Sequence, residues 1–375
     1  MARLGQRHHM SSVLVVNVGS SSLKLSVLRS DDRIEAALER DRWDGDPGDV
    51  AGFIEQHRDV AVVGHRVVHG GAEFTGPALI DQQVLARIDA LTDLAPLHQP
   101  RALAGIRAVS QLLPDVPAVA CFDTAFHAAL PAAAATYALP AAWIRQFGLR
   151  RYGFHGLSHA YASRRAAKLA SGSRIVTCHL GAGASLAAVL DGRCLDTTMG
   201  YTPLEGLVMA TRSGSVDPGL VLWLAKRGGL GVAEINDGLE KLSGLAGLAD
   251  LPSGSGDMRE VRAAADAGEQ AAALAIEVYL HRLRREIAAM AAAMNGIDVL
   301  VFTGGVGEHD ADVRAGAAAG LAFLGVAIDA KRNRGASGDT DISADAAAVR
   351  TLRITAREDI EIARQARRLQ AAVRS

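Results

Sequence analysis

A glycine, three serines and a lysine lie together near the start of the chain, between two apolar runs. Val13 to Asn17 reads as a buried strand, and the run from Leu23 to Leu28 alternates as a second strand would. Gly19 permits a sharp reversal, and serine hydroxyls with a row of backbone N–H groups can surround an anion. An ordinary serine-rich turn has the same composition, so the neighbouring motifs must decide between the two interpretations.

Two further glycine turns follow apolar strands. The segment "RIVTCHLGAGASLAAVL" at 174–190 repeats the order of the first: strand, polar residue, small-residue turn, strand. Two such hairpins predict two related domains, each offering a glycine-rich turn to the phosphates of one ligand. The third turn, "VFTGGVGEH" at 301–309, has a bare backbone that suits the close approach of a flat ring such as adenine, and equally a tight turn from strand to helix.

Two arginines and a histidine stand beside glycines in three other motifs. Arg66 lies in "VVGHRVVHGG", Arg212 in "MATRSGSVDPG" and His155 in "RRYGFHGLSH". Each of them, taken alone, is also consistent with a solvated or structural residue. Transfer of a phosphoryl group to a carboxylate, however, needs one planar cation to hold the acceptor and another to neutralise the transferring oxygens. The pair of arginines therefore favours this chemistry.

Short apolar runs alternate with longer helical patterns along the chain, which is typical of an α/β protein. At 375 residues the chain exceeds the usual size of a single core, so two domains are expected. Strands are expected at 60–68, 116–122, 174–181 and 299–305, helices at 81–93, 101–112, 158–170, 258–294 and 358–373, and a loop at 242–257.

The composition argues against several classes of function. Lys and Arg total 40 and Asp and Glu 41, a net charge of −1, so no strong field attracts nucleic acid or a membrane. Three cysteines without CxxC spacing indicate a reduced, cytoplasmic protein. The chain has no GxxxxGK[ST] motif, so it is not a P-loop enzyme. "GAGASL" lacks the third glycine of a dinucleotide fingerprint, so a Rossmann oxidoreductase is the poorer interpretation.

Taken together, these segments resemble the acetate kinase family, which belongs with sugar kinases, heat-shock ATPases and actin in one superfamily. The resemblance implies an α/β fold of two duplicated actin-like (ribonuclease H-like) domains, each a mixed five-stranded sheet with flanking helices, and an active-site cleft between them. It places the N-terminal domain at 11–128, completed by the C-terminal helix 360–375, and the nucleotide-binding domain at 129–359. The motifs that carry it are, in order, "NVGSSSLK", "GHRVVHGG", "LAPLH", "CFDTAFH", "RRYGFHGLSH", "CHLGAG", "DTTMGYTPLEGL", "TRSGSVDPG", "GDMRE", "FTGGVGE" and "EDIEIAR".

The resemblance also implies roles for individual residues. The catalytic residues would be Asp123, His155, Arg66 and Arg212, and the acetate pocket would be formed by Arg66, Val68, Leu97, Phe154 and Pro203. Asn17 and Glu358 would hold Mg²⁺, for which Mn²⁺ can substitute. ATP or ADP would be bound by Ser20, Ser22, Lys24, His179, Gly181, Gly183, Asp257, Met258, Arg259, Gly304, Gly305 and Gly307.

The chain departs from the family pattern at several positions, most of them on the nucleotide side. Ala182 replaces the Asn of the HLGNG turn, Ala210 a Gly, Ser215 an Asp and His309 an Asn, and Ala356–Arg357 replaces a Thr-Asn/Asp pair. The acyl side is intact. The departures therefore bear on nucleotide affinity more than on the class of acceptor.

The motifs and the resemblance together predict a cytoplasmic acetate kinase that reversibly transfers the γ-phosphoryl group of ATP to acetate by direct in-line displacement. The resemblance and the long helix expected at 258–294 also suggest a homodimer. A carboxylate is already a nucleophile, so no strong base is required. The same chemistry on propionate or another short acyl chain is the nearest alternative. A catalytically weak nucleotide-binding paralogue is the alternative from another class, and a hydroxamate assay for acyl phosphate would discriminate between them.

Overall fold

The computed structural model describes residues 12–19, 22–41, 43, 46, 48–96 and 98–374, without the side chains of residues 49 and 374. Its contacts divide the chain into two compact units. Unit 1 comprises residues 1–128, 154–161 and 357–375, and unit 2 comprises 129–153 and 162–356. Helix α7, Gly156–Leu169, begins in unit 1 and ends in unit 2.

Unit 1 is built on a mixed sheet of six strands in the order β3-β2-β1-β4-β6-β5. β1 and β2 form the antiparallel hairpin expected from the sequence, and β1, β4 and β6 run parallel. The strands are β1 Val13–Val18, β2 Ser22–Leu28, β3 Ile34–Asp41, β4 Val62–Val67, β5 Ala78–Leu79 and β6 Ala118–Phe122; the helices are α2 Gly48–Gln56, α3 Gln82–Asp89, α4 Gln99–Leu112 and α16 Glu358–Arg374, with 3-10 turns at Thr92–Leu94 and Ala125–His127.

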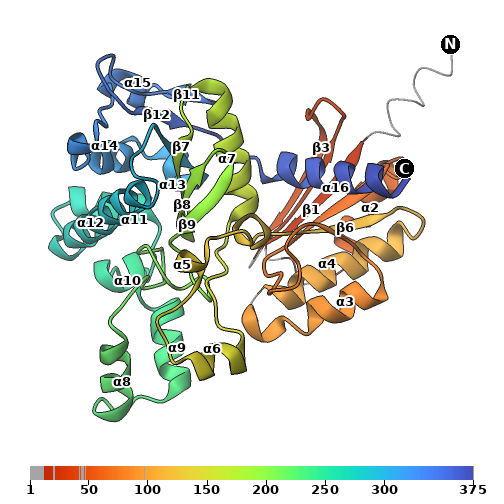
Figure 1. The fold of residues 1–375 in the computed structure, drawn as a ribbon, viewed down its shortest axis with the longest axis horizontal. Coiled ribbons are helices and arrows are strands. Elements are labelled where there is room, and N and C mark those ends of the chain that lie inside the picture. The colour runs from red at the N-terminus through yellow and green to blue at the C-terminus, as the bar shows by residue number, and fades with distance from the viewer. Residues whose placement is uncertain are drawn as a thin grey trace. The chain divides into compact units, whose positions relative to one another are not determined.

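Both faces of this sheet are covered, because successive side chains of β1 point to opposite sides. Val13 and Val15 pack with Ile362 of α16, whereas Leu14 and Val16 pack in the cluster that contains helices α2 and α4. Figure 1 shows α16, the blue C-terminal helix, beside the red and orange strands of this sheet. The last helix of the chain thus completes the core made by its first strands.

Unit 2 repeats the same topology in the order β9-β8-β7-β10-β12-β11. Here β7 and β8 form the antiparallel hairpin, and β7, β10 and β12 run parallel. The strands are β7 Arg174–Leu180, β8 Ala184–Leu190, β9 Arg193–Thr197, β10 Val299–Thr303, β11 Thr340–Asp341 and β12 Arg350–Arg353; the helices are α5 Ala132–Ala135, α6 Ala141–Phe147, α8 Pro218–Lys226, α9 Val232–Lys241, α10 Gly244–Ala249, α11 Met258–Asp266, α12 Gln270–Ala293, α13 Gly304–His309, α14 Ala311–Ala319 and α15 Ala330–Arg334, with a 3-10 turn at Ala322–Leu324.

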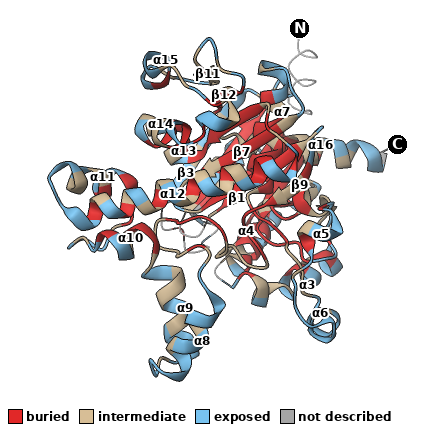
Figure 2. Ribbon diagram, turned by 60° about the vertical axis from the view of Figure 1, so that its left-hand side comes forward, coloured by how far each residue is buried: buried red, intermediate tan, exposed pale blue. Residues whose placement is uncertain are grey.

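Helix α12 is the main packing helix of unit 2. Its buried side chains recur every three or four residues, from Ala272 and Ala275 through Tyr279 and Leu283 to Ile287, and the helix contacts β7, β8 and β9. Figure 2 shows the central strand β7 as mostly buried, whereas α8 and α9 are exposed or intermediate along their length. Among the described helices, none is long and apolar enough to cross a bilayer.

Three details of the predicted architecture are wrong. The continuous helix 258–294 is two helices, because Gly268 adopts a left-handed φ of 97° between the end of α11 and the start of α12. The predicted loop 242–257 contains the short helix α10. Each sheet has six strands instead of five, since the two-residue strands β5 and β11 pair along an edge. Such short strands carry too few residues for a period to be recognised.

Candidate active site

Arg66 lies at the centre of a polar cluster in unit 1. It projects from the parallel strand β4, and Asp123 follows directly after the neighbouring strand β6. Arg66 Nε and Nη2 both donate to Asp123 Oδ2, at 3.1 and 2.7 Å, and Nη1 donates to Asn17 Oδ1 at 3.1 Å. The carboxyl ends of adjacent strands thus bring together three residues that lie far apart in the sequence.

Glu358 joins the cluster from the first residue of α16. Its Oε2 accepts from Asn17 Nδ2 at 3.0 Å and lies 3.6 Å from Arg66 Nη1. Glu358 and Asn17 present a carboxylate and an amide oxygen, which are hard ligands that suit Mg²⁺, an ion commonly held by one or two carboxylates together with substrate phosphates. The described residues contain no group of three or more His, Cys, Asp or Glu that could hold a metal ion. The donor set therefore fits a Mg²⁺ that is bound largely through a phosphate ligand.

Two carboxylates face the single cation of Arg66, and this arrangement and burial together shift the pKa values of Arg66 and Asp123. Burial lowers the pKa of Arg66, but the charges of Asp123 and Glu358 outweigh burial and raise it, so Arg66 remains a cation. Burial raises the pKa of Asp123 to about 6; Arg66 lowers it and Glu358 raises it. The pKa of Asp123 therefore rises chiefly because the carboxyl is buried, whereas that of Arg66 rises because it faces two carboxylates.

Asp123 is nearly inaccessible, with 1% of its side chain exposed. Its second oxygen, Oδ1, is buried and accepts no hydrogen bond from the described residues. The Leu157 backbone N–H favours the charged form of this carboxyl, since it lowers the pKa of Asp123.

His155 is placed beside Asp123 by an unusual backbone. It has a φ of 54°, which is rare for a residue with a side chain, and the next residue, Gly156, donates its N–H to Asp123 O at 3.0 Å. A Cβ atom at Gly156 would lie 2.0 Å from that oxygen, so only glycine fits there. A strained backbone held in place by its surroundings is typical of a functional site.

Phe154 and Val68 are buried in the same unit, with the Phe154 ring edge-on to His69 at 5.4 Å. The Phe154 carbonyl contacts His127 Nε2 at 3.0 Å. Burial lowers the pKa of His127 to about 4, so this imidazole is neutral near pH 7. Phe154, a residue of the predicted acyl pocket, therefore lies beside two imidazoles, of which that of His127 is neutral near pH 7.

The other predicted residues of unit 1 that the structure describes, Lys24 and Ser22, contact other groups. Lys24 pairs with Glu39 on the neighbouring strand at 2.7 Å, and both side chains are more than half exposed. Ser22 lies at the start of β2, and its carbonyl accepts from Gly19 N at 2.7 Å, which closes the turn. Ser20 and Leu97 lie outside the described residues.

Arg212 occupies a separate loop in unit 2. Its Nη1 donates to the Pro203 carbonyl at 3.2 Å, and its Nε lies 3.3 Å from Glu240 Oε2 at the end of α9. Burial lowers the pKa of Arg212, and Glu240 offsets part of this effect. Glu240 was not foreseen, because nothing in the sequence links an acidic residue on a solvated helix to an arginine 28 positions earlier.

The two glycine turns of unit 2 differ in what they require. Gly304 has a φ of 79°, and a Cβ atom there would lie 2.8 Å from Leu180 O, so the backbone must be bare where α13 begins. Gly305 faces open space within 4 Å. The hairpin turn between β7 and β8 is closed by a bond from Gly181 N to Gly183 O at 3.0 Å. His179 lies at the end of β7, opposite Thr303 of β10.

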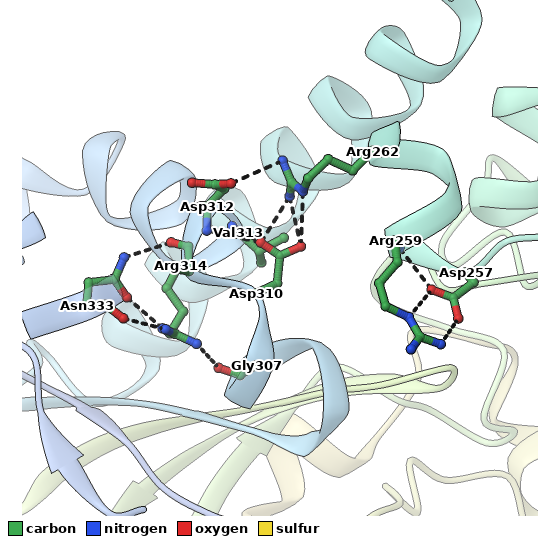
Figure 3. A network of polar contacts seen from close by, with 10 residues as sticks. Asp257, Arg259, Arg262, Gly307, Asp310, Asp312, Val313, Arg314 and Asn333 are labelled. Atoms are coloured by element: carbon green, nitrogen blue, oxygen red, sulfur yellow. Dashed lines mark hydrogen bonds and ion pairs between the residues drawn. The ribbon is translucent and has the colours of Figure 1, made fainter. Parts of the chain in front are cut away.

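Asp257 and Arg259 form a local pair at the start of α11 (Figure 3). Asp257 caps the helix through the Arg259 N–H, and the Arg259 guanidinium donates to both Asp257 oxygens at 3.0 and 2.6 Å. Arg259 is largely exposed, whereas Met258 is buried. The predicted nucleoside residues are therefore an exposed polar pair and a core side chain.

Arg314, a residue that the sequence did not single out, donates hydrogen bonds to the backbone of α13 (Figure 3). It is almost fully buried, and its Nη1 donates to the carbonyls of Gly307 and Glu308 at 2.9 Å each. Its other nitrogens donate to Asn333, on Oδ1 at 2.7 Å and on the carbonyl at 2.8 Å. No sequence signal distinguishes this arginine from a surface one, since its acceptors are carbonyls distributed over two other helices.

A duplicated mixed sheet, with an arginine–carboxylate cluster in one unit and glycine turns in the other, defines a phosphotransferase of the actin-like fold. The match to a family model narrows the class: residues 49–364 match the Acetokinase family, and the chain belongs to this acetate kinase family.

Individual relatives agree with this assignment. The chain is 46% identical to the acetate kinase of Synechococcus sp. (strain JA-2-3B'a(2-13)) over 94% of its own length and 97% of the relative's. It is similar to the solved acetate kinase of Porphyromonas gingivalis, with 36% identity and a TM-score of 0.86, covering 95% of this chain and 98% of that one. A propionate kinase from Francisella tularensis is equally similar, with 36% identity, a TM-score of 0.87 and coverage of 95% and 99%.

Proposed function

We propose that this protein catalyses the reversible transfer of the ATP γ-phosphoryl group to acetate, giving acetyl phosphate and ADP. The observation that carries the proposal is the Arg66 cluster, in a chain that is 46% identical to an acetate kinase over nearly its whole length. A cation fixed by a buried carboxylate, next to two oxygen donors for a metal, is what a phosphoryl acceptor site requires.

Arg66 would bind the carboxylate of acetate. Guanidinium has five N–H donors, and three of those of Arg66 are engaged by Asp123 and Asn17, which leaves one on each terminal nitrogen. Asp123 would hold this fork in place and would not act as a base, because acetate attacks as an anion. His155 would donate to the oxygens of the phosphoryl group in transfer.

Residues of unit 2 would hold the donor. Gly304, Gly305 and Gly307 would accommodate the nucleoside against bare backbone, and Arg212 would stabilise the charge that spreads over the phosphoryl oxygens. Asn17 and Glu358 would hold Mg²⁺, which neutralises charge on the phosphates when it is bound. The protein's own contribution is thus positioning and charge neutralisation.

The hydroxamate assay for acyl phosphate tests the proposal directly. Purified protein with MgATP and acetate should form acetyl hydroxamate when hydroxylamine is present, and the signal should need all three components. A chain that binds MgATP but forms no hydroxamate from acetate, propionate or butyrate would be the nucleotide-binding paralogue instead.

Propionate is the second candidate acceptor, because a solved propionate kinase is as similar to this chain as a solved acetate kinase. A pocket of Val68, Leu97, Phe154 and Pro203 would discriminate by shape alone, and one methylene is worth only about 1–3 kcal/mol. Side-by-side kcat/KM values for acetate, propionate and butyrate decide between the two.

We also propose that the protein is a cytoplasmic homodimer with two domains, 11–128 plus 360–375 and 129–359. Helix α8 supports self-association, because its apolar side chains Leu220, Leu222 and Trp223 are about half exposed. Sedimentation at several concentrations tests the dimer, and Trp223→Glu should shift it toward monomer. A wild-type chain that sediments as a monomer at micromolar concentration would exclude it.

A further inference from the structure

A loop of unit 2, residues 198–206, carries Pro203 and is called the proline loop below. The Pro203 carbonyl is held by Arg212. The loop's other fixed point is Tyr137, whose hydroxyl donates to Glu205 Oε2 and accepts from the Tyr201 backbone N–H, both at 2.8 Å. One oxygen atom therefore ties down the chain two residues before and two residues after Pro203.

Arg151 supports the same arrangement from the opposite oxygen of Glu205. Its Nη2 donates to Glu205 Oε1 at 2.8 Å, and its Nη1 donates to the carbonyls of Thr198 and Met199 at 3.2 and 3.1 Å. The guanidinium also lies over the Tyr137 ring, 5.5 Å from its centre. Glu205 thus has a partner on each oxygen, and its rotamer is fixed.

The close approach of these groups depends on Gly200. A Cβ atom at this position would lie 1.7 Å from Glu205 Oε2 and 2.2 Å from the Tyr137 hydroxyl. The Gly200 carbonyl accepts from the N–H groups of Tyr152 and Gly153, the residues that lead directly to Phe154. The proline loop is therefore also held by the backbone of Tyr152 and Gly153, which belong to the same unit.

The Tyr137 hydroxyl keeps its proton throughout the working pH range, because burial and the neighbouring Glu205 raise its pKa. It is thus a permanent donor to Glu205. None of these contacts involves a residue to which a role was assigned from the sequence, apart from Pro203 and Arg212. Yet together they determine where Pro203 lies.

We infer that Tyr137 is a positioning residue that sets the acyl-chain length the enzyme accepts, by fixing Pro203 through Tyr201 and Glu205. The inference rests on the proposed function, because it assumes that Pro203 borders the acyl group of a short carboxylic acid. Because the proline loop is fixed on both sides of Pro203, this residue resists the displacement that a longer acyl chain would require. Discrimination against propionate therefore depends on both hydrogen bonds of the Tyr137 hydroxyl.

Tyr137→Phe tests this inference, with Tyr279→Phe as the matched control. Tyr279 is a buried tyrosine of α12 in the same unit, and its hydroxyl has no hydrogen-bond partner within the part of the chain that the structure describes. The Tyr137→Phe enzyme should show a KM for acetate raised about 3- to 10-fold and an acetate-to-propionate ratio of kcat/KM reduced by a similar factor, with the KM for MgATP unchanged. Tyr279→Phe should alter none of these values.

The outcomes separate the inference from the proposed function. If wild-type protein phosphorylates acetate but Tyr137→Phe keeps the wild-type acetate-to-propionate ratio, the inference is wrong and the proposed function stands. A general loss of folded enzyme would lower kcat for both acids equally and leave their ratio unchanged, which also counts against it. If Tyr137→Phe does not fold, Glu205→Gln, which retains an acceptor for Tyr137 but loses the charge that pairs with Arg151, should relax the ratio in the same direction. Wild-type protein that phosphorylates neither acid would overturn both.

Discussion

Arg66→Lys is the most informative perturbation of the candidate site, because it keeps the charge and removes the fork. Arg66 makes two hydrogen bonds to one oxygen of Asp123 and a third to Asn17, and a single ammonium group cannot reproduce this planar geometry. The substrate carboxylate would therefore lose an oriented partner. Removal of one preorganised electrostatic donor costs about 10²–10³ in kcat, or about 2.7–4 kcal/mol, and we expect a loss of kcat/KM for acetate in this range.

The fold should survive this substitution, because Asp123 keeps a cation beside it. In Arg66→Ala the same carboxylate, only 1% exposed, would be left without its partner. Breaking a buried pair in this way typically costs about 3–5 kcal/mol of stability, so the alanine variant confounds activity with unfolding. Lysine separates the two effects.

The assay combines acyl hydroxamate formation with urea unfolding of the same preparations. Arg174→Lys is the control. Arg174, the first residue of β7 in unit 2, makes a comparable forked contact with Asp298, outside the proposed site. It should retain full activity. Arg66→Lys with more than a third of wild-type kcat/KM and an unchanged unfolding midpoint would refute the assigned role of Arg66.

Three further predictions follow from the same structure. The kcat/KM for acetate should fall below about pH 6, because burial raises the pKa of Asp123 to about 6, above the ordinary value near 4, and a protonated Asp123 no longer offers Arg66 a charged partner. Glu358→Gln should move this acidic limb to lower pH in the residual activity, since the Glu358 charge raises the pKa of Asp123. Arg314→Lys should raise the KM for MgATP about 10-fold at unchanged KM for acetate, because a lysine cannot serve four carbonyl and amide oxygens and α13 loses its support. Ala182→Asn should raise kcat/KM for MgATP several-fold, because an amide on this exposed turn gains a hydrogen bond to a charged phosphate.

Each of these predictions has a result that contradicts it. A flat profile between pH 5 and 7 would exclude Asp123 as the group whose charge the reaction needs. Arg284→Lys is the control for Arg314, because Arg284 also donates to a backbone carbonyl, but to that of Gly316 on α14 instead of those of α13; equal changes in KM for MgATP would mean that Arg314 contributes only general packing. A lower kcat/KM for MgATP in Ala182→Asn would mean that this turn is built around alanine.

The duplicated fold was predictable because its main elements have a recognisable local sequence pattern. An apolar run, a small-residue turn and a second apolar run recur at 13–28 and 174–190, and both became antiparallel hairpins at the same place in their sheets. The helix break at Gly268 could not be predicted from periodicity, because alanines continue on both sides of it and only the backbone conformation changes. The two-residue edge strands form only once a neighbouring strand exists to pair with them.

The residues of the candidate site likewise divide into those that sequence motifs identified and those that only the structure revealed. Arg66, Asp123, Asn17 and Glu358 were named from motifs, and the structure brings them into one cluster because the strand ends and the start of α16 coincide. Residues that act on backbone atoms left no such trace. Tyr137 accepts from the Tyr201 backbone N–H and Arg314 donates to backbone carbonyls of α13, and such contacts leave no complementary side chain in the sequence that would reveal them.

The departures from the family pattern follow the same distinction between side chain and backbone. Ala182 accepts through its carbonyl from Ala210 N at 3.1 Å, and Ala210 in turn accepts from Ala246 N at 2.9 Å. Ala356 donates its N–H to Glu308 Oε1 at 2.8 Å. At these positions the structure uses the peptide group, which survives any change of side chain except proline. The backbone architecture at these positions is therefore compatible with the alanines, and under the proposed function they would forfeit only direct side-chain contacts with the nucleotide.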